Sequence, residues 1–439
     1  MGGKHMGRRT KWLMLALAAL TIMGSYYTYD SIAPVAGQLR NERGFSHAQI
    51  GLLNAVFNLP NIALALIGGI LIDRIGAAKA ILIAAAICAL GAILTAIGDP
   101  YGLMLVGRLI FGLGNETLYI ALLVGISQWF FNGQGALAVA LFFSTARIGS
   151  YSADKSTSWF APLYAEGWQP PLWLAAGLTS LGVVTALIYF LVDRKNAHLR
   201  ANTAPSESFR LSELRGFSPS FWHILWLNVL FASVFFPFRS TFSIQYFQDV
   251  KGMSLADAGT ANSYVFAAAI FATPIFGLIA DRWGKRASLL LLAAALMPLN
   301  FLLLALTEAG LWVTTALMGL SFSVIPAVIW PATAMLVERH RVGTAFGLIN
   351  MIQSLGLALA NLAAGALNDY FGASHGHPEG YDAMLLMFAG LSLVGFICAA
   401  LLWHRQRYLG EAGIEARHIA PPPSEAGSAN FAQGNLEKA

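Results

Sequence analysis

The sequence predicts an all-α membrane protein with twelve transmembrane helices in two six-helix bundles. First, 57% of the 439 residues are hydrophobic and only 11% are charged, whereas a soluble domain carries roughly 25% charged residues. Second, about twelve apolar runs are long enough to cross a bilayer. Third, one long polar break divides these runs into two equal sets. So few charges cannot cover a soluble fold of this size, and the surface must therefore face lipid.

A spanning helix needs roughly 20 mostly apolar residues. The expected spans are residues 12–36, 48–73, 78–98, 101–131, 134–161, 170–192, 221–248, 255–280, 285–306, 309–337, 342–368 and 381–404. The break at residues 193–220 is expected to be a cytoplasmic linker between an N-terminal bundle, residues 1–192, and a C-terminal bundle, residues 221–407. Residues 408–439 are rich in Pro, Ala, Gly and Glu, which predicts a disordered cytoplasmic tail.

The distribution of lysine and arginine predicts the orientation, because basic residues are retained in cytoplasmic loops. If the N-terminus lies inside, the outer loops contain only Arg40, Arg43 and Lys251, and the other loop cations lie inside. Both termini are therefore expected in the cytoplasm. The net charge of +5 then reflects membrane topology, and we expect no nucleic-acid partner.

Other classes of protein find little support in the sequence. The two cysteines, Cys88 and Cys398, lie far apart in apolar runs, and no Cys/His cluster has metal-ligand spacing. We therefore expect no disulfide, metal or cofactor, and a monomer in the bilayer. A membrane-bound enzyme would need a clustered nucleophile and base or a metal site, and a sensor usually carries a soluble output domain. Neither feature is visible, so both remain minor alternatives.

An internal repeat supports two similar halves. Residues 69–76 contain Gly-x-x-x-Asp-Arg-x-Gly, and residues 277–284 contain the same spacing. Each copy follows the second apolar run of its half. Repeated halves are typical of duplicated transporters, so the sequence predicts a transporter.

Charged residues inside the expected spans are candidates for function. Each costs at least roughly 2.5–3.5 kcal/mol unless it faces a cavity or a partner. They are Asp30, Arg108, Glu116, Arg147, Asp154, Lys155 and Arg239.

Glu116 and Arg147 lie near the middle of two neighbouring runs joined by a tight turn. At helical spacing, Tyr119 shares a face with Glu116, and Tyr151 shares a face with Arg147. The planar guanidinium of Arg147 suits a carboxylate, and Glu116 suits an ammonium group. The pair predicts a site for a zwitterion. The alternative is that the two charges neutralise each other across the helices.

Asp30, which follows Tyr29, lies near the outer end of the first run, and Arg239 lies near the outer end of the seventh. These runs are equivalent in the two halves, so an Asp30–Arg239 contact could latch the outer side. The alternative is that each charge reaches the interface independently by snorkelling.

The other candidates have weaker signals. Asp154 and Lys155 lie one turn from the outer end of their run, and we expect both at the outer mouth. Arg108 is expected to be structural or to act in coupling. Trp330 precedes Pro331 deep in its run, where proline can kink a helix. It is a candidate to line a cavity, with ordinary packing as the alternative.

The repeated loops resemble the signature of the major facilitator superfamily, and Gly107-Arg108-x-x-x-Gly112-x-Gly114 resembles that superfamily's second motif. The resemblance implies two bundles around a central cavity that opens alternately to each side. It also implies that the repeated loops hold one state closed. The alternative is that these loops only anchor the helices at the membrane face. The residues concerned are Asp73, Arg74, Asp281 and Arg282.

Several segments resemble the lysosomal dipeptide transporter branch of that superfamily. They include Tyr29-Asp30, Gly112-x-Gly114-x-Glu116, Ala146-Arg147-Ile148-Gly149-Ser150 and Trp330-Pro331. In that branch a Glu on helix four and an Arg on helix five are thought to hold the amino and carboxyl termini of a peptide, and Glu116 and Arg147 fall in the matching motifs. Asp154 and Lys155 depart from the family's uncharged positions. The chain looks more like a bacterial inner-membrane relative than a lysosomal protein.

We therefore predict a secondary transporter of dipeptides, either a uniporter or coupled to protons through Glu116 with Arg108 as a second coupling candidate. The expected partners are the lipid bilayer and a small zwitterionic peptide. The alternative substrates are organic anions or amino acids held mainly by Arg147. The expected substrate contacts are Glu116, Arg147, Tyr29, Asp30, Tyr119, Tyr151, Arg239 and Trp330.

Overall fold

The computed structural model describes residues 2–130, 134–200, 216–306, 311–338, 341–409 and 413–416. Most of the expected linker (201–215) and of the expected tail (417–439) lie outside the described residues, as do the side chains of residues 2–8, 65–70, 73, 136 and 306. The described chain is almost entirely helical. Among the described residues, nine helices are long and apolar enough to cross a membrane.

Each expected apolar run falls largely within one helix or two successive helices. The α-helices are α1 (Gly2–Asp30), α2 (Ile32–Arg43), α3 (His47–Ile75), α4 (Ala77–Ile97), α5 (Tyr101–Trp129), α6 (Gly135–Trp159), α7 (Ala161–Ala165), α8 (Gln169–Lys195), α9 (Pro219–Pro237), α10 (Ser243–Lys251), α11 (Leu255–Trp283), α12 (Arg286–Leu306), α13 (Leu311–Leu336), α14 (Val342–Tyr370) and α15 (Asp382–Leu409). Three short turns join them: η1 (Ala197–Leu199), η3 (Phe238–Phe242) and η5 (Pro378–Tyr381).

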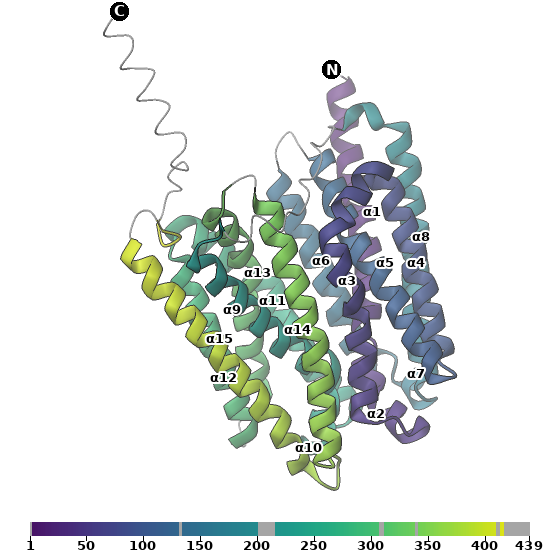
Figure 1. Cartoon of the computed structure of the whole chain (residues 1–439). Coiled ribbons are helices and arrows are strands. Elements are labelled where there is room, and N and C mark those ends of the chain that lie inside the picture. Colours follow the sequence, from purple (N-terminus) through teal and green to yellow (C-terminus); the bar gives the residue numbers. More distant parts are fainter. Residues whose placement is uncertain are drawn as a thin grey trace, which may run out of the picture.

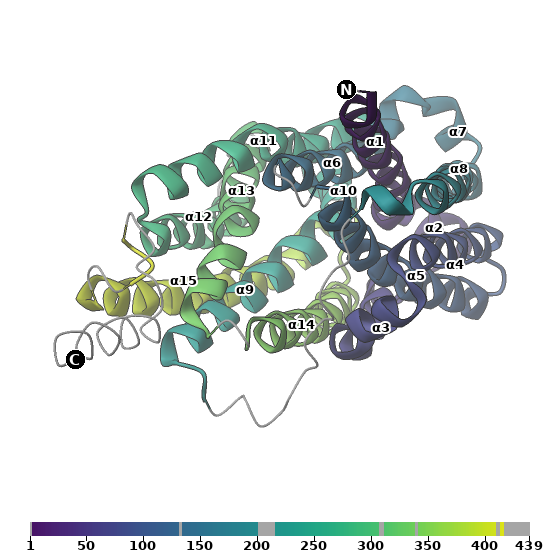
Figure 2. The ribbon, with the colours of Figure 1, turned by 90° about the horizontal axis from the view of Figure 1, so that it is seen from above.

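The helices lie side by side in two groups, α1–α8 and α9–α15, which we call the first and second halves (Figures 1 and 2). Each half packs around its own apolar core. The first core includes Phe57, Phe111 and Tyr189, and the second includes Phe235 and Phe322. α1 starts and α15 ends on one side of the molecule, the terminal face, whereas α2, α7 and α10 lie on the opposite side, the far face (Figure 1).

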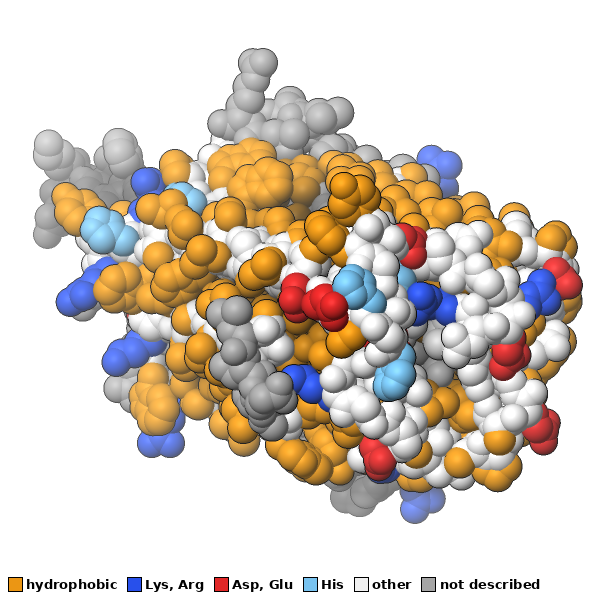
Figure 3. Space-filling view, turned by 90° about the horizontal axis from the view of Figure 1, so that it is seen from below, with side chains coloured by type: hydrophobic (Ala, Val, Ile, Leu, Met, Phe, Trp, Pro, Cys, Tyr) orange, Lys and Arg blue, Asp and Glu red, His pale blue; other side chains and the backbone are white. Residues whose placement is uncertain are grey.

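Large hydrophobic side chains remain exposed on the outward surfaces of the helices, as lipid contact requires. Phe271 is 73% exposed and Leu278 is 70% exposed. Seen from the far face, hydrophobic side chains cover much of the surface, and charged and histidine side chains lie both on the face and around its edge (Figure 3).

The repeated loop motif has the same backbone requirement in both halves. Its last glycine is Gly76 in the first copy and Gly284 in the second, with φ of 87° and 69°. Residues other than glycine rarely adopt positive φ. The repeated spacing therefore places a glycine with positive φ directly after α3 and directly after α11.

The two halves touch where α3 runs along α14 and α6 runs along α11 (Figure 2). Glycines allow this approach. A Cβ atom at Gly51 on α3 would lie 2.4 Å from the Asn361 carbonyl oxygen, and one at Gly259 on α11 would lie 2.2 Å from Thr157 Oγ1. Both distances are far below van der Waals contact, so close packing of the halves needs glycine at these positions.

Two expected spans prove to be interrupted. The run 12–36 breaks at Ser31, between α1 and α2. In the run 221–248, Pro237 is followed by a π-helical turn at Phe238–Phe242. Proline removes one N–H donor and crowds the carbonyl four residues earlier, so the regular ladder changes there. Interruptions of this kind free backbone groups, which must then find partners inside the protein.

A carboxylate of the second half caps a helix of the first half on the far face. Asp369, at the end of α14, accepts hydrogen bonds from the backbone N–H groups of His47 and Ala48 at the start of α3, both at 2.8 Å. The His47 imidazole Nε2 lies 2.9 Å from the Ala373 carbonyl oxygen. A carboxylate at a helix N-terminus is stabilising, so these contacts hold the two halves together at the far face.

We expect Asp369→Ala to weaken far-face closure. Losing a helix cap shifts an equilibrium by roughly fivefold, so the fraction of molecules open at the far face should rise by about that factor. Spin labels at Glu166 and His375, which are exposed on far-face loops of the two halves, would report the distance distribution. Ser254→Ala is the control, because Ser254 caps α11 within one half. An equal shift in the control would contradict the assignment.

Candidate functional site

Arg147 lies on α6, at the interface with the second half. Its guanidinium carbon is 5.5 Å from the ring centroid of Tyr26, 5.1 Å from that of Phe266 and 4.8 Å from that of Phe322. Its Nη1 atom is buried and has no hydrogen-bond partner among the described residues. A buried, unpartnered donor is costly, and three aromatic rings compensate only part of that cost. The Arg147 side chain therefore has a buried donor that an anion could bind.

Glu116 lies half-buried on α5, and no described carboxylate, Glu116 included, forms an ion pair with Arg147. The alternative in which the two charges neutralise each other is therefore wrong for this conformation. Tyr26 lies against the Arg147 guanidinium, and Tyr119 lies about one turn from Glu116 on α5. Tyr119 also packs its ring 6.1 Å from that of Phe143. Glu116, Arg147 and these two tyrosines thus share one region of the first half.

Arg239 forms an ion-pair network with two carboxylates. Its Nη1 atom lies 2.5 Å from Asp30 Oδ1, and its Nη2 atom donates to Asp154 Oδ2. Side-chain exposure is 0% for Arg239, 1% for Asp30 and 0% for Asp154. The expected Asp30–Arg239 contact is present. The placement of Asp154 at the outer mouth is wrong, because this carboxylate turns inward to share the guanidinium. Lys155, its half-buried neighbour, donates instead to Thr260 Oγ1 at 2.9 Å.

The interrupted helix around Arg239 explains its position. The carbonyl oxygen of Arg239, in the π-helical turn, accepts from Ser243 Oγ at 2.8 Å and from Asn262 Nδ2 at 3.1 Å. The Ser243 hydroxyl also lies 2.8 Å from Asn262 Oδ1. These bonds fix the backbone of η3 against α11. The guanidinium is consequently held at the junction of the two halves.

Arg108 has a structural role in this conformation. Its guanidinium donates to the carbonyl oxygens of Leu53, Thr28 and Tyr29, each at 3.3 Å, and the last two lie near the end of α1. It also donates to Asn54 Oδ1. Asn54 Nδ2 in turn donates to the Ser240 carbonyl oxygen at 3.1 Å. Arg108 thus stabilises one broken helix and, through Asn54, contacts the other.

The remaining predicted substrate contacts lie in different places. Tyr29 packs its ring 4.7 Å from that of Phe57, beside Asp30. Tyr151 packs 6.1 Å from the Trp159 ring and against the core of the second half. Trp330 packs 5.1 Å from the Phe346 ring. The structure gives Trp330 no described contact with Arg147 or Arg239.

The predicted gating residues lie where the repeated loops meet the terminal face. Asp281 is 81% exposed and lies 3.4 Å from Arg286 of its own half. Arg74 and Arg282 are also exposed. The side chain of Asp73 lies outside the described residues.

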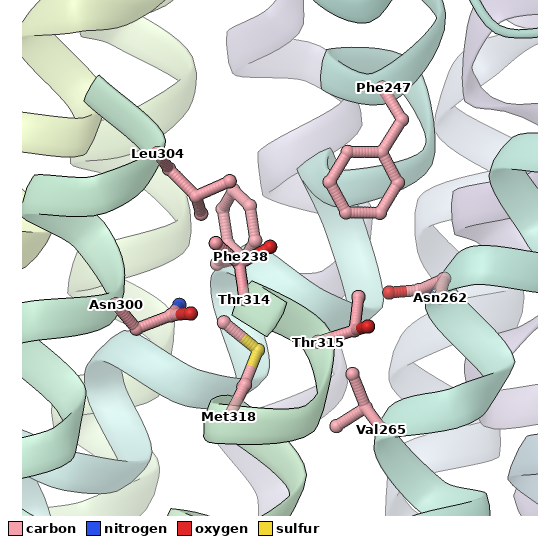
Figure 4. A pocket seen from close by; sticks show the side chains of 9 residues that line it. All are labelled: Phe238, Phe247, Asn262, Val265, Asn300, Leu304, Thr314, Thr315 and Met318. Atoms are coloured by element: carbon pink, nitrogen blue, oxygen red, sulfur yellow. The ribbon is translucent and has the colours of Figure 1, made fainter. Parts of the chain in front are cut away.

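A separate small cavity, about 10 Å³ in volume, lies inside the second half, between η3, α10, α11, α12 and α13. The Asn300 amide points into it together with Thr314 and Thr315 (Figure 4). Neither polar atom of this buried amide has a described hydrogen-bond partner. None of the predicted site residues lines this cavity.

Sequence reasoning missed two aromatic residues of the second half that contact Arg147. Phe266 and Phe322, which contact Arg147, belong to α11 and α13. Phenylalanine is common in apolar runs, so composition gives no signal for either residue. Asp154 did carry a signal, because a carboxylate inside a span needs a partner.

The chain is a polytopic helical membrane protein with buried, paired charges at the junction of two halves. These features indicate the general class of membrane transporters. Residues 15–356 and 240–433 match the family model of the Major Facilitator Superfamily. The chain belongs to the major facilitator superfamily. The relatives that it matches are transporters and not enzymes, so the chain moves a small molecule across a membrane in which it is embedded.

Two relatives and two solved structures describe the similarity further. The chain is 30% identical to the lysosomal dipeptide transporter MFSD1 of Homo sapiens over 417 residues, which cover 91% of this chain and 87% of the relative. It is 20% identical to the probable sulfoacetate transporter SauU of Cupriavidus necator, with 90% and 94% covered.

Among solved structures, the fold is similar to an inward-facing, unoccupied bacterial homolog of the human lysosomal transporter Spinster, with a TM-score of 0.70, 18% identity and coverage of 92% and 98%. It is also similar to the nucleoside transporter NupG, with a TM-score of 0.71, 15% identity and coverage of 90% and 99%. At this identity the likeness concerns the fold alone.

Proposed function

We propose that this protein transports dipeptides by alternating access, with twelve spans in two six-helix bundles. The observation that carries the proposal is the unpartnered Arg147 guanidinium at the interface of the halves, with Glu116 in the same region of the first half. Arg147 would bind the peptide carboxylate through its planar fork. Glu116 would bind the free amine. Recognition of the two termini leaves the side chains loosely selected.

Two further findings support a dipeptide substrate. The matched human relative, whose name states dipeptide transport, is 30% identical over most of both chains. Tyr26 lies against the Arg147 guanidinium, and Tyr119 shares α5 with Glu116. Tyrosine hydroxyl groups can donate or accept hydrogen bonds, which suits the amide of a short peptide.

In the cycle that we propose, the far face and the terminal face close alternately. Far-face closure would use the Asp369 cap and the Arg239 network, which together join the halves in the present state. Terminal-face closure would use the repeated loops, with Asp73, Arg74, Asp281 and Arg282 forming contacts between the halves. The protein would lie in a bacterial plasma membrane, and the positive-inside distribution supports an orientation with the terminal face in the cytoplasm. Whether a proton accompanies the substrate depends on whether Glu116 titrates during the cycle.

Thermal stabilisation of the purified protein tests the proposal directly. A ligand that binds only the folded state raises the melting temperature. At a ligand concentration of 100 times Kd, the free energy of unfolding increases by about 2.7 kcal/mol. We would compare dipeptides, tripeptides, free amino acids and dicarboxylates. Stabilisation by dipeptides that is lost on N-acetylation or C-amidation supports the proposal. The absence of any dipeptide effect would overturn it.

Organic anions are the second candidate substrates, because the sulfoacetate transporter relative spans nearly all of this chain and because Arg147 has no described anionic partner. In the same panel, stabilisation by small sulfonates or dicarboxylates without a dipeptide effect would select this candidate. Glu116 would then have no ligand ammonium to bind.

Glu116→Gln should show whether the Glu116 carboxylate binds the amine of the substrate or has only a structural role. Glutamine keeps the shape but loses the negative charge, so the affinity for peptides with a free amine should fall by about tenfold or more, as for a lost charge-assisted hydrogen bond. Affinity for N-acetylated peptides should change little. Isothermal titration with matched peptide pairs would measure both. An equal loss for the two ligands would assign Glu116 a purely structural role.

A further inference from the structure

One phenylalanine ring contacts two arginines that have different proposed roles. Phe266, on α11, is fully buried. The Arg147 guanidinium carbon lies 5.1 Å from the centroid of its ring, and the Arg239 guanidinium carbon lies 4.0 Å from the same centroid. Arg147 belongs to the proposed substrate site, whereas Arg239 belongs to the ion-pair network with Asp30 and Asp154. The ring therefore connects the two sites physically.

The same two sites also meet along one face of α6. Arg239 Nη2 donates to the Ser150 carbonyl oxygen at 3.3 Å and to Asp154. Residues 147, 150 and 154 are spaced three and four apart, which places them on one face of the helix. A change at Arg147 can thus reach the network both through a rigid helix and through the Phe266 ring.

The electrostatics of the ring predict how neutralising Arg147 affects the position of Arg239. The face of an aromatic ring attracts a cation, and the two guanidinium groups compete for the same ring. A carboxylate bound at Arg147 neutralises one of the two cations. The ring then interacts more favourably with Arg239 in its present position. That position is the one in which Asp30 and Asp154 join the halves near the far face.

We propose that Phe266 is a positioning residue that transmits carboxylate binding at Arg147 to the Arg239 network. An occupied substrate site thereby favours closure of the far face. The proposal rests on the proposed function in one respect, since it takes Arg147 to be the residue that binds the carboxylate. Beyond that function, the proposal assigns a role to Phe266 of the second half. Phe266 would respond to a carboxylate at Arg147 without itself binding the charged groups of the substrate.

Spin-label distances provide a test that needs no substrate. Arg147→Ala removes the same positive charge that a bound carboxylate neutralises. With labels at Glu166 and His375, we expect Arg147→Ala to lower the fraction of far-face-open molecules by about 2- to 10-fold, the range implied by one cation–π contact. In a Phe266→Leu background, which has no π face, Arg147→Ala should have a clearly smaller effect on that fraction, because only the contact along α6 remains.

Phe322→Leu is the matched control. Phe322 lies 4.8 Å from the Arg147 guanidinium carbon and, among the described residues, has no cation–π contact with Arg239. In this background Arg147→Ala should keep its full effect. Phe266→Met, which also lacks a π face, serves if Phe266→Leu does not fold.

Two results would overturn the proposal. One is an equal effect of Arg147→Ala with and without the Phe266 ring, and the other is no effect of Arg147→Ala in the parent protein. The failure of every dipeptide to bind would instead count against the proposed function alone, because the distance measurement does not use a peptide.

Discussion

Replacing Arg147 with alanine should abolish measurable dipeptide binding. In the structure the guanidinium is partly buried among aromatic rings, and its Nη1 atom has no described partner. A ligand carboxylate would therefore form a charge-assisted pair in a region with little water. Truncating one partner of such a pair costs about 2–5 kcal/mol, which is about 30-fold or more in Kd. Isothermal titration with a dipeptide that stabilises the parent protein would measure the loss.

Arg147→Lys and Lys79→Ala complete this experiment. Lysine keeps the charge but lacks the planar fork, so an intermediate loss of about tenfold is expected for one lost hydrogen bond to a charged group. Lys79 is an exposed cation on α4, and its removal should not alter binding. Unchanged dipeptide affinity in Arg147→Ala would remove the central residue from the proposed site.

Arg239→Met should destabilise the protein more than any other single substitution considered. It leaves Asp30 and Asp154 together with side-chain exposures of 1% and 0% and without their shared cation. Removing one partner of a buried ion pair costs about 3–5 kcal/mol. We expect a marked fall in the melting temperature in detergent, followed by intrinsic fluorescence. Methionine preserves much of the apolar volume, so the loss would report charge and not packing.

Two comparisons isolate the cause of that loss. The triple variant Asp30→Asn, Asp154→Asn and Arg239→Met removes all three charges and should recover much of the stability, since a buried ion pair replaced as a unit is often neutral. Arg43→Ala breaks an exposed pair with Asp99 at 2.6 Å and should not change the melting temperature measurably. A melting temperature of Arg239→Met close to that of the parent would show that the network contributes no stability.

The predicted helices and the structure agree well because lipid imposes a simple rule on the sequence. A segment that crosses the bilayer must be apolar over its whole length and must satisfy its backbone internally. Each expected run accordingly lies in one helix or two successive helices. The interruptions at Ser31 and Phe238–Phe242 were not predicted, because hydropathy reports the length of an apolar run but not its hydrogen-bond ladder.

The charged residues inside the spans also show what the sequence predicts and what only the structure reveals. That Asp30, Arg108, Glu116, Arg147, Asp154 and Arg239 needed cavities or partners followed from the cost of charge in a membrane. Which partner each one found did not follow. Asp154 was expected at an outer mouth and instead shares Arg239 with Asp30, while Arg108 binds backbone carbonyls.

The sequence by itself determined the fold class, the repeated loop motif and the residues that carry charge into the membrane, because each depends on local composition and spacing. Only the tertiary structure decided that Phe266 and Phe322 surround Arg147, that Asp369 caps a helix of the other half, and that three charges meet at two broken helices. These contacts join residues far apart in the chain. Their energies depend on distance and burial across the interface of the halves, which no local pattern encodes.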